Sequence, residues 1–94
     1  MRLKEKEKQV IIQAVRSIDP EAQVYLFGSR VDESRKGGDI DLLVFSSRMT
    51  YGDKLKIKKN IFALLGEQKI DLLVSQDAGN PFVRTALEQG VRLV

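Results

Sequence analysis

The five letters "IDLLV" occur twice in this chain, at residues 40–44 and again at residues 70–74. Each copy is a short apolar run of the kind that forms a buried β-strand, and each contains one aspartate. A strand core needs leucine and valine but has no need of aspartate. Packing therefore accounts for the two strands and leaves the two carboxylates, Asp41 and Asp71, to be explained by function.

The segments around these runs alternate between helix and strand patterns. The apolar periodicity predicts a helix over residues 3–18 and a second one over residues 52–66. We expect the second helix to turn Leu55, Ile61, Phe62 and Leu65 toward the core and to end at Gly66. Strands are predicted over residues 23–28, 39–45 and 69–75.

The end of the chain predicts one more helix. Asn80 is a good N-cap and Pro81 suits the first helical position, Phe82, Val83, Ala86 and Leu87 supply an apolar face, and Gly90 ends the helix. Residues 91–94 add a last short strand. The order is α-β-β-α-β-α(-β), which is an α/β (α+β) fold with a small mixed sheet flanked by helices. The strand–helix–strand unit predicts parallel pairing of the two "IDLLV" strands, and residues 1–94 make a single domain.

Composition narrows the classes of function. The chain has no Cys and no His, so a metal site must use oxygen ligands, which suit Mg²⁺ or Mn²⁺. The lack of Cys also fits a cytoplasmic location. No apolar run approaches the length of about 18 residues that a membrane span needs, and the N-terminus does not read as a secretory signal. A formal charge of +3 is compatible with a nucleotide or an acidic partner and makes nucleic-acid binding unexpected.

Three carboxylates are predicted to converge. Alternation along a strand places Asp39 and Asp41 on one face, and the parallel strand brings Asp71 to the same face. Adjacent carboxylates repel each other unless a cation neutralises them. Three carboxylates are about what two Mg²⁺ ions need when phosphate oxygens supply the other ligands. Taken alone, Asp39 and Asp41 could be charges of a turn or a sheet edge, and Asp71 could cap a strand or pair with Lys69.

A phosphate site is predicted just upstream. Gly28 and Ser29 directly follow a strand, where glycine lets the backbone approach a phosphate and serine adds a donor. A short helix beginning here would point its amides at the same anion, and Arg30, Arg35 and Lys36 lie close by in sequence. Gly-Ser is a common turn by itself. Together with the acids it indicates phosphoryl or nucleotidyl transfer.

The whole stretch "FGSRVDESRKGGDIDLLV" resembles the signature of the DNA polymerase β-like nucleotidyltransferase superfamily, which has Gly-Ser, a spacer, Asp-x-Asp and a later third carboxylate. The small size and the element order are similar to the minimal nucleotidyltransferases, which are often the antitoxin partners of HEPN-domain toxins. The resemblance implies that Gly28, Ser29, Arg30 and Lys36 hold ATP. It implies Asp39, Asp41 and Asp71 as the catalytic, Mg²⁺-binding carboxylates, with Asp71 a candidate base.

The implied activity is transfer of AMP from ATP to a tyrosine of a partner HEPN toxin. The sequence departs from the usual pattern of the minimal members, because Asp32 and Glu33 stand where Arg and Gly are common and Gly38 replaces a Ser. This departure keeps open a second hypothesis, a catalytically weak antitoxin that neutralises its toxin by binding alone. A third, a nucleic-acid-processing transferase, is disfavoured because the chain has no basic second domain.

Overall fold

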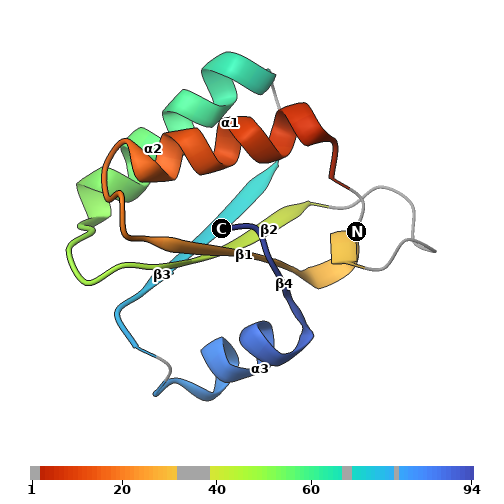
Figure 1. Cartoon of the computed structure of the whole chain (residues 1–94), viewed down its shortest axis with the longest axis vertical. Coiled ribbons are helices and arrows are strands. Elements are labelled where there is room, and N and C mark those ends of the chain that lie inside the picture. Colours follow the sequence, from red (N-terminus) through yellow and green to blue (C-terminus); the bar gives the residue numbers. More distant parts are fainter. Residues whose placement is uncertain (1–2, 32–38, 67–68, 78) are drawn as a thin grey trace.

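A four-stranded mixed sheet forms the centre of the molecule (Figure 1). The computed structural model describes residues 3–31, 39–66, 69–77 and 79–94. In chain order the elements are α1 (Glu5–Arg16), β1 (Gln23–Phe27), the short 3₁₀ helix η1 (Gly28–Val31), β2 (Ile40–Phe45), α2 (Tyr51–Leu65), β3 (Ile70–Ser75), α3 (Pro81–Gln89) and β4 (Val91–Arg92). The predicted element order is confirmed, including the final short strand.

The strand order is β3-β2-β1-β4. β2 pairs with β3 in parallel, as the strand–helix–strand pattern predicts, while β1 is antiparallel to both β2 and β4. The sheet is therefore mixed. Its topology brings the C-terminal end of β1 to the same end of the sheet as the N-terminal ends of β2 and β3, where Gly28, Asp39, Asp41 and Asp71 lie.

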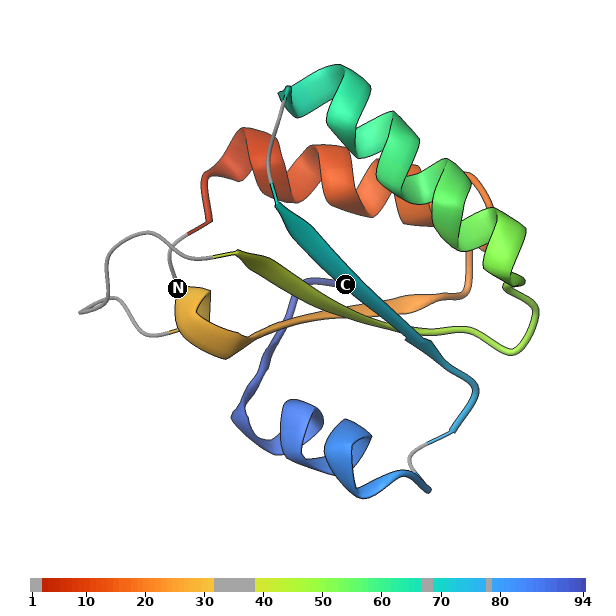
Figure 2. The ribbon, with the colours of Figure 1, turned by 180° about the vertical axis from the view of Figure 1, so that it is seen from behind.

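The two faces of the sheet are covered unequally (Figures 1 and 2). Helices α1 and α2 lie together over one face and enclose the main core, whose fully buried members include Ile11, Val15, Val24, Leu26, Ile40, Leu42, Val44, Ile57 and Ile61. Helix α3 covers part of the other face, where Val83 and Ala86 pack around Leu43. The alternation in "IDLLV" explains this arrangement, because Leu42 and Leu43 necessarily point to opposite faces.

The helix ends follow local sequence signals. The side chain of Asn80 accepts a hydrogen bond of 2.8 Å from the backbone N–H of Phe82, with Pro81 opening α3. Gly66 ends α2 with a positive φ of 78°. No helix in the described ranges is long and apolar enough to cross a membrane.

The inward side of α2 differs from the prediction. Ile61 is buried and Leu65 is partly buried, as expected, but Leu55 and Phe62 are about half exposed, and the other buried position is Ile57. The sequence prediction for Leu55 and Phe62 is therefore wrong. Helix α2 has apolar residues on two of its sides, and only one of these sides can pack on the sheet.

Candidate functional site

Gly28, Asp41 and Asp71 lie where three strand ends converge. In the register of the sheet, Phe27 at the end of β1 lies opposite Asp41 of β2, and Asp41 lies opposite Asp71 of β3. Leu42 and Ile40, the neighbours of Asp41, are fully buried against the helices. Asp41 therefore points to the other face of the sheet, and parallel pairing places Asp71 beside it.

Gly28 brings the backbone directly against the carboxylate of Asp41. Its φ of +76° is in the left-handed region that favours glycine. A Cβ atom built on Gly28 would collide with Oδ2 of Asp41 and would lie 3.0 Å from its Cγ. The chain then continues into η1, so the short helix expected after Gly28 is present. Glycine is thus required here both by conformation and by space.

Asp41 is the electrostatically strained group of the site. Its pKa is raised above the ordinary value of 3.8, first because partial burial disfavours the charged carboxylate, and then because of Asp71. The negative charge of Asp71 and a hydrogen bond between the two side chains both favour a proton on Asp41, and the charge of Asp39 adds a smaller contribution. Asp41 therefore responds to both of the other acids, and the convergence of all three on one metal site stays a prediction.

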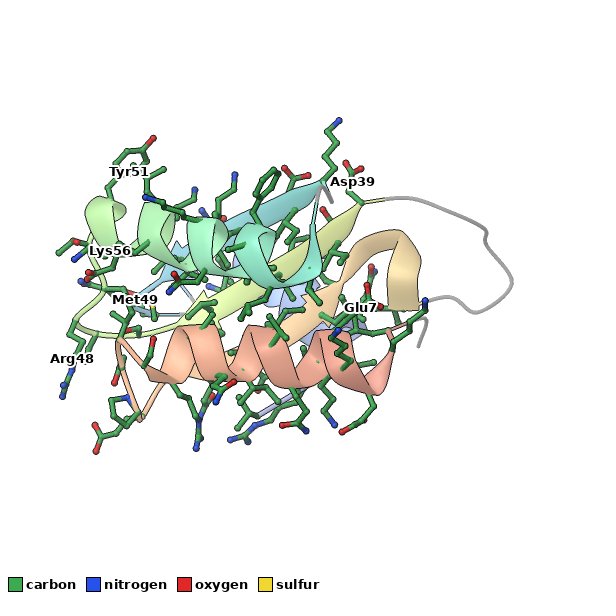
Figure 3. The ribbon with its side chains drawn as sticks, turned by 90° about the horizontal axis from the view of Figure 1, so that it is seen from above. Glu7, Asp39, Arg48, Met49, Tyr51 and Lys56 are labelled. Atoms are coloured by element: carbon green, nitrogen blue, oxygen red, sulfur yellow. The ribbon has the colours of Figure 1, made fainter. Side chains whose placement is uncertain are left out.

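Asp39 has a different immediate partner. It precedes the first residue of β2, Ile40, and its Oδ2 atom lies 3.7 Å from Nζ of Lys69 (Figure 3). Both side chains are substantially exposed, so the ion pair is worth about 1 kcal/mol or less. The prediction that residue 39 belongs to the strand is wrong by this one position. The alternative pairing of Lys69 with Asp71 is replaced by a contact with Asp39.

The donor set suits a hard divalent cation. Among the residues that the structure describes, no three acidic, His or Cys side chains are arranged to hold a metal ion as they stand. Asp41 and Asp71 nevertheless lie together, and Asp39 makes an exposed ion pair with Lys69. Carboxylate oxygens are the ligands that Mg²⁺ prefers, and a cation would remove the repulsion that raises the pKa of Asp41. The metal assignment remains a prediction.

The structure describes only some of the predicted nucleotide-binding residues. Gly28 lies at the site, next to Asp41. Lys36 lies outside the described residues, as do Asp32, Glu33, Arg35, Gly38 and the side chains of Ser29 and Arg30. The role of these groups in holding ATP stays a prediction.

A buried polar cluster at the opposite end of the sheet was not anticipated from the sequence. Asp19 is 2% exposed and accepts a 2.6 Å hydrogen bond from Oγ of Ser46 and a 3.0 Å bond from the backbone N–H of Glu21. These two bonds, with the nearby Arg48 guanidinium at 3.6 Å, lower the pKa of Asp19 despite its burial. The cluster ties the end of α1 to the end of β2. The sequence had predicted only that the first helix ends at residue 18, just before Asp19.

Comparison with known proteins gives one family and one fold. Residues 9–94 match the family model described as "Polymerase beta, Nucleotidyltransferase". No curated protein matches the chain. Among solved structures, the chain is similar to one in the complex of the tri-AMPylated Shewanella oneidensis HEPN toxin with MNT antitoxin, with a TM-score of 0.74 and 21% identity over 98% of this chain and 72% of the other. The toxin–antitoxin complex MntA–HepT gives a TM-score of 0.72 and 20% identity, covering 97% and 72% of the two chains.

Proposed function

Because the chain belongs to the polymerase beta nucleotidyltransferase family, we propose that it transfers AMP from ATP to a hydroxyl group of a partner protein. The partner proposed is a HEPN-domain toxin and the acceptor a tyrosine, so that the transfer would make this protein an antitoxin. The observation that carries the proposal is the in-register pair Asp41 and Asp71 with Gly28 against it. In this proposal the acidic pair belongs to a metal-binding set, and the strand end at Gly28 receives the phosphates.

The similar solved complexes support the choice of partner and product. One contains a HEPN toxin that is tri-AMPylated and bound to MNT antitoxin, and another is the pair MntA–HepT. The likeness is one of fold at about a fifth sequence identity, so the partner and the AMP transfer are proposals for this chain. The support from this chain itself is the in-register pair Asp41 and Asp71, the preceding Asp39, and Gly28 against Asp41.

In the proposed reaction the acceptor oxygen forms a bond to the α-phosphorus of ATP, and the bond from that phosphorus to the pyrophosphate oxygen breaks. Asp39, Asp41 and Asp71 would hold Mg²⁺, which neutralises phosphate charge and stabilises the leaving pyrophosphate. Asp71 is exposed beside Asp41 and would accept the proton of the attacking hydroxyl. The backbone at Gly28 and the following turn η1 would receive the phosphates.

The test uses the HEPN-domain protein that we expect the adjacent reading frame to encode. Labelled ATP should transfer AMP to this protein in the presence of Mg²⁺, and the mass of the partner should rise by one AMP per modified tyrosine. Transfer should be lost in Asp39→Ala/Asp41→Ala. Protection of cells by that variant, with the mass of the toxin unchanged by the wild type, would instead favour an antitoxin that acts by binding alone.

A further inference from the structure

Helix α2 carries a stripe of three large apolar side chains that remain half or more exposed. Tyr51, Leu55 and Phe62 are 73%, 50% and 51% exposed. They fall on one side of the helix, at positions i, i+4 and i+11. Single exposed apolar residues are normal on a protein surface, whereas three in a row on one helix are typical of an interaction surface.

The stripe lies along the open edge of the sheet. Figure 2 shows β3 at this edge with α2 beside it, and β3 pairs only with β2 in the described part of the sheet. In Figure 3, Tyr51 and Asp39 mark the two ends of the same edge. We call this surface the α2–β3 edge and define it by Tyr51, Leu55, Lys58, Lys59, Phe62 and Lys69 together with strand β3.

Two hollows lie along the α2–β3 edge. One, of about 460 Å³, lies at the Asp39 end, and the other, of about 320 Å³, lies at the Tyr51 end. Their linings are Lys58, Lys59, Phe62, Lys69 and Ile70 for the first, and Met49, Thr50, Tyr51, Lys54, Leu73, Val74 and Gln76 for the second. The surface can therefore seat side chains of a docked segment at both ends.

The charge that lines the two hollows is one-sided, and the neighbouring carboxylates, Asp71 of β3 and Asp39, lie outside both linings. No Asp or Glu lines either hollow among the described residues, whereas four lysines do. Lys59 makes no ion pair with any other described residue, and Lys69 has only its exposed contact with Asp39. Such a surface attracts an acidic segment and repels a second copy of itself.

We propose that the α2–β3 edge binds an acidic segment of the acceptor protein that also presents apolar side chains to Phe62 and Tyr51. The inference rests on the proposed function and adds how the acceptor is held. Because Lys69 lines one hollow and also contacts Asp39, a segment seated there reaches the carboxylate end of the sheet. Open strand β3 offers main-chain hydrogen-bonding groups to the same segment.

A random copolymer of glutamate and tyrosine is the probe, because it is acidic, carries aromatic side chains and needs no identified partner. Its binding to the full chain is measured by fluorescence anisotropy in EDTA and without ATP. Lys59→Glu should weaken binding by about three- to tenfold, and Phe62→Ala should weaken it to a similar degree. Lys56→Glu and Leu64→Ala are the matched controls, since both residues are exposed on another side of α2, and they should bind like the wild type.

Several results would overturn the inference. If Lys59→Glu and Lys56→Glu weaken copolymer binding equally, the attraction comes from the net charge of the protein and not from the α2–β3 edge. A single-stranded RNA oligonucleotide that binds more tightly than the copolymer, with the same sensitivity to Lys59→Glu, would assign the surface to nucleic acid. A dimer in sedimentation that Phe62→Ala dissociates would assign it to a second copy. Circular dichroism confirms that each variant is folded.

The docking surface and the proposed chemistry can fail separately. Asp39→Asn/Asp41→Asn should bind the copolymer at least as tightly as the wild type, because it removes negative charge beside Lys69, and it should transfer no AMP to the copolymer. Loss of binding in this variant would mean that the segment is held by the carboxylate end, which contradicts the α2–β3 edge. If the wild-type chain binds the copolymer but transfers no AMP to it, the proposed docking surface is supported and the result counts against the transferase.

Discussion

The backbone of Gly28 and the carboxylate of Asp41 are packed so closely that no side chain fits between them. A Cβ on Gly28 would meet Oδ2 and Cγ of Asp41, and the φ of +76° is unfavourable for any other residue. Because Phe27 pairs with Asp41 in the antiparallel register, the turn after β1 lies over the start of β2. Gly28, which we expect to bind phosphate, is therefore in direct contact with Asp41, which we expect to bind metal.

Gly28→Ala is expected to destabilise the protein and displace the carboxylate of Asp41. The left-handed backbone alone costs about 1–2 kcal/mol for a residue with a Cβ, and the collision adds to it. The matched comparison is Gly28→Ala in an Asp41→Ala background, where the carboxylate that would collide with the new Cβ is absent. Urea unfolding should show a larger loss for Gly28→Ala in the wild-type background than in the Asp41→Ala background. Equal losses in the two backgrounds would mean that the contact with Asp41 costs nothing.

Asp41→Asn is expected to leave the metal-free protein as stable as the wild type or more so. The raised pKa means that the folded state binds a proton more tightly than the unfolded state, so Asp41 lowers stability as the pH rises above 3.8. Solvent screens the partly exposed group, and removing its charge should gain up to about 1 kcal/mol at pH 7. Thermal unfolding in EDTA measures the change. A clear fall in melting temperature would make Asp41 a structural residue.

Divalent metal is expected to bind at Asp39, Asp41 and Asp71, and more tightly when a nucleotide is present. The like charges that raise the pKa of Asp41 are what a cation would neutralise. Calorimetric titration with Mn²⁺, with and without a non-hydrolysable ATP analogue, measures the affinity. Binding should be lost in Asp39→Asn/Asp41→Asn, and equal binding by this variant and the wild type would exclude the site.

Lys36→Ala is expected to slow AMP transfer if Lys36 touches the triphosphate, as the resemblance to the nucleotidyltransferases implies. Loss of one charged contact to the transition state costs about 10²–10³ in rate. The measurement is the initial rate of label transfer from ATP at saturating Mg²⁺. Lys56→Ala, on the outer side of α2, supplies a matched lysine control and should leave the rate unchanged.

Ser46→Ala is expected to weaken the fold and to move acid unfolding to higher pH. The hydrogen bond from Ser46 is the first cause of the lowered pKa of Asp19. A lowered pKa contributes stability above the ordinary value of 3.8 that is lost as the pH falls through the folded pKa. Without Ser46 this contribution shrinks, and the melting temperature should fall by a few degrees. Ser47→Ala, at an exposed neighbouring position, should change neither quantity.

The outcome at α2 shows why periodicity did not fix which side is buried. Leu55 and Phe62 lie on one side of this helix and Ile57 and Ile61 on another, and both sets are apolar. A helix pattern identifies candidate faces, but only packing against the sheet selects one of them. Two of the four residues predicted to face the core, Ile61 and Leu65, do so. The other two, Leu55 and Phe62, lie on the α2–β3 edge.

The sequence alone was sufficient to predict the local structure. The apolar run "IDLLV" predicted strands β2 and β3, Asn80 and Pro81 predicted the start of α3, and Gly66 predicted the end of α2. Each of these signals acts on neighbouring residues. The same run indicated that Asp41 and Asp71 share a face, since a strand–helix–strand unit makes the strands parallel. These relations need no knowledge of distant contacts.

Only the tertiary structure decided the relations between segments far apart in the chain. The antiparallel pairing of β1 with β2 set Gly28 against Asp41, the neighbouring strand ends paired Asp39 with Lys69, and Asp19 met Ser46 across 27 positions. The physical reason is that each of these contacts depends on strand order and register. Strand order and register are set by how the whole apolar core packs, and several arrangements satisfy the same local pattern.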